Sequence, residues 1–478
     1  MALGKSLTSR EYGTYSLIGS LSAMSGATTL SAFQYFNRHV PGRELREGLS
    51  LFKSVLVPQT ILLTTAFAFL FFFSGLRGEF ARIMEISSQP ALFLLIAAIL
   101  LLDGIATEFM RYLYARKEIE RGNIVTFFQN SFWAFLLFLL FLATPQWIDF
   151  LVVLNVWLAG LILAVGYSIW KTGFKDLLKV PWSMGTYMSA IRFGLPFIMT
   201  YSASTALSFG RFFLAGIHSA EEVGIFSYHY NIIAMIGALS SPLIGNPIDP
   251  YAVEAYNHGR YEHSSILLTA SLKYRLFLVI PLLTAAASCS ESLIRFLAKE
   301  QFVASPWLLF SMVPIPVLLT LASSLERIYF LEKRMAIAGL CHLAGGIVQV
   351  AAFPLLIPIH PLYGIVTAIN VGLLIQTVFL WTFSRGGQLS IQTNGWKMFL
   401  ATVISGITGW IISRTTILFP PAIALILAAS SAVIGFIIPI FFLRLLPPSE
   451  FKALHGIIRG KDGEKKKEQP LAAASLEG

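Results

Sequence analysis

Long apolar runs recur along almost the whole chain and are separated by short polar stretches. A helix rises 1.5 Å per residue, so about 20 apolar residues cross the roughly 30 Å hydrocarbon core of a bilayer. The pattern predicts a polytopic membrane protein with about 13 transmembrane helices. The predicted spans are residues 13–36, 50–75, 91–114, 124–143, 148–170, 190–216, 224–247, 274–294, 305–330, 336–358, 362–384, 396–414 and 420–443.

Within each run the apolar residues are continuous and do not alternate with polar ones. The block "ILLTTAFAFLFFF" at residues 61–73 is an example. A transmembrane β-barrel would instead show segments of about ten residues that alternate between apolar and polar. The predicted fold class is therefore an all-α membrane bundle.

Composition agrees with this class and charge gives the topology. Of the 478 residues, 56% are hydrophobic and only 13% are charged, whereas about a quarter are charged in an ordinary soluble domain. The net charge of +10 would suit a nucleic-acid partner, but 27 of the 35 lysine and arginine residues fall in alternate loops and the C-terminal tail. Because positive loops mark the cytoplasmic side, we expect a cytoplasmic C-terminus, the lipid bilayer as partner and no nucleic acid.

The cysteines and the C-terminal tail carry little chemistry. Cys289 and Cys341 lie near opposite membrane faces in this topology, so we expect neither a disulfide nor a metal site. The basic run at residues 460–470 predicts a disordered tail with affinity for anionic headgroups. Residues 471–478 have the composition of a vector-derived remnant, which carries no information on the fold.

A short motif occurs twice. "SREYGTYS" at residues 9–16 returns as "AEEVGIFS" at residues 220–227, so that Gly13 corresponds to Gly224 with an offset of 211 residues. The predicted first and seventh spans begin at these glycines, so the repeat unit is six helices. An even number of crossings restores orientation, which predicts two parallel six-helix lobes around a central cavity.

The repeat also divides the chain and points to a missing helix. The second copy follows the span at 190–216, whereas Met1 stands where the last turn of an equivalent helix belongs. We therefore expect a native product that starts upstream and has 14 spans with both ends inside. The predicted parts are an N-terminal lobe (1–180), a C-terminal lobe whose first helix opens the second repeat (181–414), an appended helix (415–446) and the tail (447–478).

Three helices have the composition of cavity-lining segments. Residues 16–32 and 193–213 are rich in Gly, Ala, Ser and Thr, and residues 230–251 contain Pro242, Pro247 and Pro250. The prolines predict that the cytoplasmic half of that helix kinks or unwinds. Tight helix packing through small residues is the alternative explanation for this composition.

Several segments together resemble a known family. They are the motif at 9–13 with its small-residue helix, "FGLPFI" at 193–198, "AEEVGIFS" at 220–227 and "LIPIHPLYGIVTAI" at 356–369. They are similar to the polysaccharide-type flippases of the multidrug/oligosaccharidyl-lipid/polysaccharide exporter (MOP) superfamily, which serve O-antigen and exopolysaccharide synthesis. The resemblance covers nearly the whole chain apart from the first family helix.

The resemblance implies two six-helix lobes with a cavity that opens alternately to each side of a bacterial inner membrane. It implies a polyprenyl-pyrophosphate-linked oligosaccharide as substrate, no cofactor, other polysaccharide assembly proteins as partners, and coupling to H⁺ or Na⁺ as an open question. We expect a monomer. The family often has an acidic residue before the arginine that ends the helix at 190–216, but Gly210 precedes Arg211 here. The ion-coupling role proposed for that acidic residue in the family therefore cannot be assigned to this position of the chain.

Charged residues inside spans cost about 2.5–3.5 kcal/mol on insertion scales, so each is a functional candidate. Arg211 could hold a phosphate through its bidentate guanidinium, or could extend to the outer headgroups. Arg38 and the neighbouring Gln34 lie at the cytoplasmic end of the first span, where a headgroup would enter, although extension to the headgroups explains Arg38 equally well. Tyr201 is a further candidate for the cavity wall.

Three acidic residues are candidates for ion coupling. Asp103 lies in the middle of its span with no local partner, as a proton-coupled carboxylate would. Glu108 lies three residues before Arg111, and this pair could simply be neutralised on one helix face. Asp249 lies between two prolines, where unwound carbonyls beside a carboxylate could hold Na⁺.

Four further charged residues lie at the predicted cytoplasmic edge of the membrane: Lys273, Arg275, Glu326 and Arg327. They could form a gate, or they could simply set the topology of the chain. No catalytic or metal-binding pattern is present in the sequence.

Other functions compete with that of a flippase. A drug or cation antiporter of the same superfamily would need acidic rather than basic cavity residues. A membrane-embedded polyprenyl-lipid glycosyltransferase or polymerase would need a large extramembrane loop, and the outer loops are short, such as "TPQWID" at 144–149. A scramblase or scaffold without directional coupling stays open. The sequence therefore favours a transporter over an enzyme.

Overall fold

The computed structural model describes residues 2–40, 44–86, 89–305, 307–389, 391, 395–415 and 421–442. All regular secondary structure in these ranges is helical, which confirms the predicted all-α class. The predicted tail at 447–478 lies outside the described residues.

Nine of the predicted spans meet the length and apolarity expected of a membrane helix within the described residues. They are α3 (Leu45–Phe72), α5 (Pro90–Ala115), α6–α7 (Ile119–Thr126 and Trp133–Ala143, joined by η1), α8 (Phe150–Thr172), α12 (Ala220–Ser240) with η3, α14 (Tyr261–Ser288), α16–α17 (Trp307–Met312 and Pro314–Leu331), α18 (Met335–Leu356) and α19 (Pro361–Ser384).

Helices also occupy the other four predicted spans. They are α2 (Ser9–His39), α10 and α11 (Met184–Thr200 and Ser202–Ile217), α20 (Gly395–Thr415) and α21 (Pro421–Phe442). The span predicted at 190–216 is broken at Tyr201, whose backbone angles of −93° and 0° separate α10 from α11. The remaining short helices are α1 (Ala2–Ser6), α4 (Ser74–Met84), α9 (Phe174–Lys179), α13 (Asn246–Asn257), α15 (Ser290–Leu297), η2 (Pro145–Trp147) and η4 (Glu300–Phe302).

The chain forms two compact units. Unit 1 comprises Met1–Asn231, Ile294–Ile315 and Met335–Phe379, and unit 2 comprises Ile232–Leu293, Pro316–Arg334 and the chain from Leu380 onward. These units reflect packing rather than the repeat, so the predicted lobe boundary at residue 180 and the appended helix at 415–446 stay predictions.

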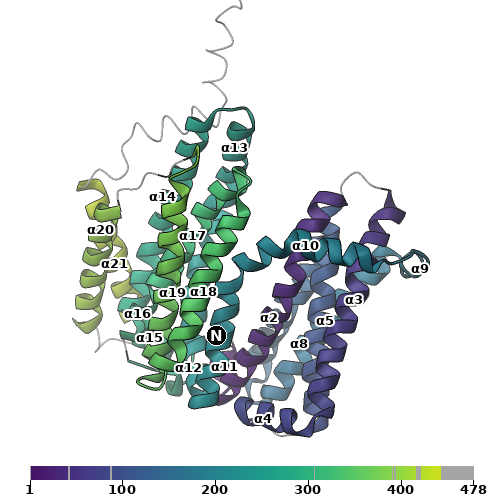
Figure 1. Cartoon of the computed structure of the whole chain (residues 1–478). Helices are drawn as coiled ribbons and strands as arrows, with labels where there is room; N and C mark the ends of the chain where they lie inside the picture. Colours follow the sequence, from purple (N-terminus) through teal and green to yellow (C-terminus); the bar gives the residue numbers. More distant parts are fainter. Residues whose placement is uncertain are drawn as a thin grey trace, which may run out of the picture. The chain divides into compact units, whose positions relative to one another are not determined.

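In unit 1, α5 is the helix around which the N-terminal part of the chain packs. It contacts α2, α3 and α8, and Figure 1 shows α5 and α8 side by side. The broken pair α10 and α11 runs from this group to α18, since both helices contact α2 and α18. The pair therefore connects segments of unit 1 that are far apart in sequence.

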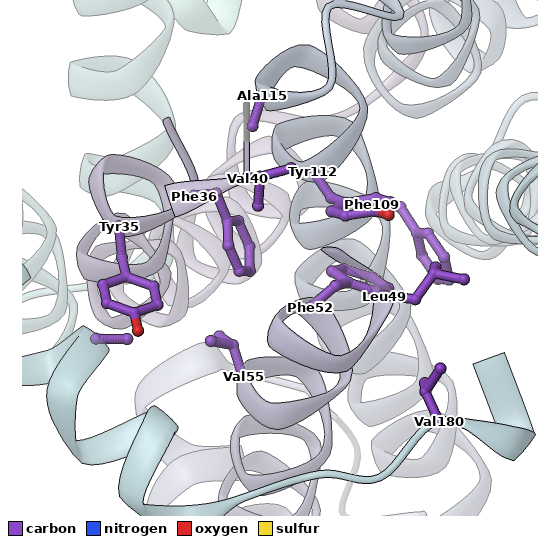
Figure 2. Close-up of a cluster of buried hydrophobic side chains, with 11 residues drawn as sticks. Tyr35, Phe36, Val40, Leu49, Phe52, Val55, Phe109, Tyr112, Ala115 and Val180 are labelled. Atoms are coloured by element: carbon purple, nitrogen blue, oxygen red, sulfur yellow. The ribbon is translucent and has the colours of Figure 1, made fainter. Parts of the chain in front are cut away.

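A cluster of buried side chains, many of them aromatic, joins α2, α3 and α5 (Figure 2). Phe52 of α3 stacks on Tyr112 of α5 with ring centroids 4.6 Å apart, and lies 4.8 Å from the ring of Phe109. Phe36 of α2 lies against both Phe52 and Tyr112. Because buried aromatic pairs stabilise beyond their area alone, this cluster fixes how α2, α3 and α5 pack.

Two π-helical turns interrupt the spans. One is η1 (Phe127–Phe132), and the other is η3 (Ser241–Gly245), which joins α12 to α13. The prolines of residues 230–251 predict that this segment kinks or unwinds. The segment is not unwound in the structure, so that part of the prediction is wrong. The backbone stays helical from α12 through η3 into α13, past Pro242, Pro247 and Pro250.

In unit 2, α14 packs against α13, α20 and α21. Leu272, Leu276 and Ile280 of α14 form a buried cluster with Phe436 of α21. The helices α20 and α21 lie side by side (Figure 1), with Gly435 packed against Thr408.

Candidate functional site

The two copies of the repeated motif contact each other directly in unit 1. A Cβ atom placed on Gly13 would lie 1.7 Å from the carbonyl oxygen of Ala220, and one placed on Gly224 would lie 1.8 Å from the carbonyl oxygen of Ser9. Ser9 and Ala220 are themselves 211 residues apart, so the two contacts are equivalent. The helices therefore meet backbone to backbone, which only glycine permits at this distance.

The same motif contains the start of each helix. Thr8 caps α2 in a capping box with Glu11, and the hydroxyl of Ser219 accepts a hydrogen bond from the backbone N–H of Glu222 at 3.2 Å. The helices begin at Ser9 and Ala220, so the prediction that they begin at the glycines is wrong by about one turn. The caps extend each helix beyond its apolar run.

Arg211 of α11 lies between α2 and α12. Its Nη1 donates a hydrogen bond to the hydroxyl of the buried Ser20 at 3.1 Å, and the guanidinium carbon lies 5.3 Å from the centre of the Tyr230 ring and 6.0 Å from that of Phe226. Its Nε is buried without a hydrogen-bond partner. No carboxylate among the described residues forms an ion pair with Arg211. The site thus combines a fixed positive charge with an unused donor.

Asp103 of α5 has partners that the sequence did not suggest. The hydroxyl of Ser22 on α2 donates a short hydrogen bond to one carboxylate oxygen, and Nε2 of Gln129 donates to the other at 2.8 Å. Gln129 lies on η1 and also contacts the hydroxyl of Thr107 at 2.8 Å. The sequence offered Asp103 no partner on its own helix, and the partners that it has come from other segments of the chain. Its role in ion coupling stays a prediction.

Glu108 and Arg111 lie together on α5. One carboxylate oxygen is 3.7 Å from Nη1 of Arg111, and the two side chains are 1% and 10% exposed. Tyr201, at the break between α10 and α11, lies close enough to Arg111 to interact with it electrostatically. This geometry favours mutual neutralisation of Glu108 and Arg111, and leaves Tyr201 at the edge of the same polar group.

In unit 2, charged residues that were predicted at the cytoplasmic edge join three helices. Nη2 of Arg327 on α17 lies 3.1 Å from Oδ2 of Asp249 on α13. Arg275 of α14 donates hydrogen bonds to Ser323 and Ser324 of α17, at 3.1 and 3.2 Å. Arg275 thus links α14 to α17, and Arg327 links α17 to α13. A gate formed by these residues stays a prediction.

The reason for assigning Na⁺ to Asp249 does not hold in this structure. Its carboxylate is paired with Arg327, and the surrounding α13 is helical rather than unwound. Glu326 and Lys273 are partly buried in the same unit. Ion coupling through Asp249 stays a prediction without that support.

Gln34 and Arg38 lie on α2, but outside the residues whose side chains the structure describes. Their predicted contact with an entering headgroup stays a prediction.

A cavity of about 880 Å³ lies in unit 1 beside α11. It is lined by residues of α2, α3, α10, α11 and α18: Met24, Leu62, Tyr187, Ile191, Ile198, Met199, Ser202, Thr205, Ala206, Phe209, Leu343, Gly346, Ile347, Val350 and Ala351. None of these residues carries a charge, so the cavity is chemically distinct from the Arg211 site.

No family model and no curated protein matches the sequence. Among solved structures, the lipid II flippase MurJ in an inward closed conformation aligns with a TM-score of 0.69 over 92% of this chain and 95% of that chain, at 14% identity. A multidrug resistance MATE family transporter of the MOP superfamily, in an inward-facing conformation, aligns with a TM-score of 0.59 over 79% and 91%, at 13% identity. The chain therefore shares the fold of these two proteins. This confirms the expected two-lobe architecture.

The structure gives a steric reason why glycine, and not the acidic residue that the resemblance leads one to expect, precedes Arg211. A Cβ atom at this position would lie 2.5 Å from the ring of Phe353 on α18, and that ring is 1% exposed. The side of α11 at Gly210 is therefore filled by a neighbouring helix, and an acidic side chain does not fit beside Arg211.

Sequence reasoning missed the partners of the two central charges. Ser20 and Ser22 belong to a helix that is rich in small residues along its whole length. Nothing in the sequence indicates which of its hydroxyl groups contacts Arg211 or Asp103. Gln129 is brought to Asp103 by a π-helical turn, which leaves no pattern in the sequence.

Proposed function

We propose that this chain is a flippase that moves polyprenyl-pyrophosphate-linked oligosaccharides from the cytoplasmic to the outer leaflet of a bacterial inner membrane by alternating access. The MOP fold supports a transporter, and MurJ, which shares this fold, is a lipid II flippase. The observation that carries the proposal is Arg211, a cation within the membrane-spanning part that no described carboxylate neutralises.

Moving such a lipid breaks no covalent bond. The protein must supply positive charge for the pyrophosphate, a polar path for the sugar, and an opening through which the tail stays in the bilayer. Ser20 and the ring of Tyr230 fix the guanidinium of Arg211, so the Nε donor, which has no hydrogen-bond partner, is oriented before the substrate arrives. Paired N–H groups suit phosphate oxygens, and they bind more strongly where water is excluded.

The membrane potential can give the transport its direction. A negative charge that leaves a negative-inside cell gains about 2.3 kcal/mol per 100 mV. Coupling to H⁺ or Na⁺ through Asp103 or Glu108 is therefore compatible with the proposal but not required by it. From the loop charges we place the C-terminus in the cytoplasm. We place Gln34, Arg38 and Tyr201 along the path of the headgroup. We propose that the protein is a monomer that works beside other polysaccharide assembly proteins.

The test is reconstitution in liposomes with a labelled polyprenyl-pyrophosphate oligosaccharide. We expect wild-type protein to move the lipid between leaflets, and Arg211→Ala to lower the rate by about tenfold or more, the loss expected for one charged hydrogen-bond donor. Arg211→Lys, which keeps the charge, should retain more of the rate. Arg82→Ala is the matched control, because Arg82 is 65% exposed and pairs with the equally exposed Glu79 on its own helix. No movement by the wild type would refute the flippase function.

A drug or cation antiporter is the second candidate, favoured by the carboxylate of Asp103 beside Ser22 and Gln129. In the same liposomes, an antiporter would exchange an organic cation for H⁺ or Na⁺ and would ignore the lipid-linked sugar. A protein that moves the cation but not the lipid would decide for this alternative.

A further inference from the structure

The short helix α9 and the residues that flank it have the composition of a segment at a membrane surface. Trp170, Leu178 and Trp182 are exposed large apolar residues, and lysines lie between them at residues 171, 175 and 179. The ammonium group of Lys171 lies 3.8 Å from the centre of the Trp170 ring. Tryptophan and lysine are typical of the level where hydrocarbon meets the lipid headgroups. The segment at 170–182 therefore suits the headgroup level, on the side that the positive loops predict to be cytoplasmic.

Polar side chains of α3 hold this segment in place. Nζ of Lys53 donates hydrogen bonds to the backbone oxygens of Leu178 and Val180, at 2.9 and 2.8 Å, at the end of α9. The hydroxyl of Ser50 donates another to the backbone oxygen of Pro181 at 2.9 Å. The start of α3 and the end of α9 are thus fixed against each other before any ligand arrives.

A cavity of about 430 Å³ lies between the start of α3 and the end of α9. Three apolar and three charged residues line it: Leu45, Leu49, Val180, Arg46, Asp176 and Lys179. Leu49 and Val180 are buried and belong to the cluster shown in Figure 2, so the core of unit 1 fixes the apolar floor. Arg46 and Lys179 are exposed, and neither forms an ion pair with Asp176 or with any other carboxylate in the described part of the chain. The cavity thus has a net positive charge beside an apolar floor.

We propose that this cavity binds the headgroup phosphate of an anionic phospholipid, whose glycerol backbone lies on Leu45, Leu49 and Val180. The proposal does not depend on the flippase function. Glycerol phosphate has about ten non-hydrogen atoms and needs at most about 300 Å³, if each takes the roughly 30 Å³ of a water molecule in the liquid. It therefore fits into about 430 Å³. Basic pockets at the cytoplasmic ends of membrane helices suit such headgroups, because the leaflet on that side is anionic.

The mixed lining favours a phospholipid over other anions. A soluble phosphate gains only from Arg46 and Lys179, which are exposed and are therefore screened by salt. A phospholipid also covers the apolar lining and is already concentrated at the membrane surface. Asp176 opposes any anion, and with it the lining carries one net positive charge. That balance matches the single charge of a phosphodiester better than the two charges of a pyrophosphate.

Lipid binding by the full-length protein tests the site. Native mass spectrometry from detergent micelles measures the dissociation constant of the first bound phosphatidylglycerol. We expect the double variant Arg46→Gln/Lys179→Gln to raise it about tenfold, because two charged donors are lost. Asp176→Asn should lower it about threefold, because a like charge is removed, and damage to the fold would not produce such a gain. The matched control is Lys117→Gln/Lys333→Gln, which removes two exposed lysines that do not line the cavity.

Two further ligands identify the bound molecule as an anionic lipid. Phosphatidylcholine with the same acyl chains should bind the wild type more weakly and should distinguish it less from the double variant. Glycerol 3-phosphate, which has no acyl chains, should compete only at far higher concentration than the lipid. Competition at equal concentration would show a site for soluble phosphates and would overturn the assignment to a lipid. Unchanged phosphatidylglycerol binding in the double variant, or an equal loss in the control, would overturn the site itself.

Discussion

The contact between the two repeated motifs leads to a quantitative prediction for its glycines. An alanine methyl at residue 13 would lie 1.7 Å from the carbonyl oxygen of Ala220, and real Cβ contacts essentially never fall below 3.0 Å. The backbones of α2 and α12 must therefore separate locally by about 1.3 Å, the difference between these values. The obstacle is backbone, which cannot rotate away as a side chain can. We predict that Gly13→Ala destabilises the protein by about 1–3 kcal/mol, the range for overpacked sites.

Gly224→Ala should cost about the same, because its contact with Ser9 is equivalent at 1.8 Å. One separation of the helices accommodates both methyl groups. The double variant should therefore cost little more than either single variant, a non-additivity expected of residues that share one contact.

The matched control is Gly19→Ala. Gly19 lies on the same helix α2, and a methyl group added there would meet no atom within 4 Å, so alanine should stabilise the helix by up to about 1 kcal/mol. The measurement is unfolding of purified protein in mixed detergent micelles, followed by tryptophan fluorescence. A Gly13→Ala variant as stable as Gly19→Ala would refute the close contact. Fully additive losses in the double variant would refute the shared separation.

Three further predictions concern the charged sites and α11. Asp103→Asn should abolish any dependence of transport on an imposed H⁺ or Na⁺ gradient while leaving gradient-free movement intact; dependence that persists in this variant rules out Asp103 as the coupling site. Gly210→Ala should lose about 1 kcal/mol or more of stability against the ring of Phe353, whereas Gly216→Ala on the same helix, with no neighbour within 4 Å, should not. A double-mutant cycle on Asp249 and Arg327 should give a coupling of roughly 0.2–1 kcal/mol because Arg327 is 48% exposed; a value several times larger would show a desolvated pair instead.

The helices were predictable because a bilayer imposes one simple requirement on sequence. Every predicted span contains helix, since about 20 apolar residues have few other stable arrangements in hydrocarbon. The errors come from local chemistry that hydrophobicity does not register. Capping at Thr8 and Ser219 moved two helix starts by a turn, and the break at Tyr201 divided a span that reads as continuous.

The candidate site was predictable only as a set of charges. Arg211 and Asp103 stood out because charge is rare within spans, but their partners Ser20 and Ser22 are 191 and 81 residues away along the chain. Such pairings depend on how helices are rotated and shifted against each other. A single sequence carries no record of that packing, so the geometry of the site required the structure.

The structure gives the repeated motif a physical explanation. Thr8 and Ser219 cap equivalent helices, Glu11 and Glu222 follow at the third helical position, and the two glycines come two residues later. Each glycine meets the residue that begins the other helix, so exchanging the two copies leaves the contact unchanged. A local two-fold axis must therefore pass between Gly13 and Gly224. Residues at such an axis meet the same constraint in both copies, which explains why the motif is repeated there.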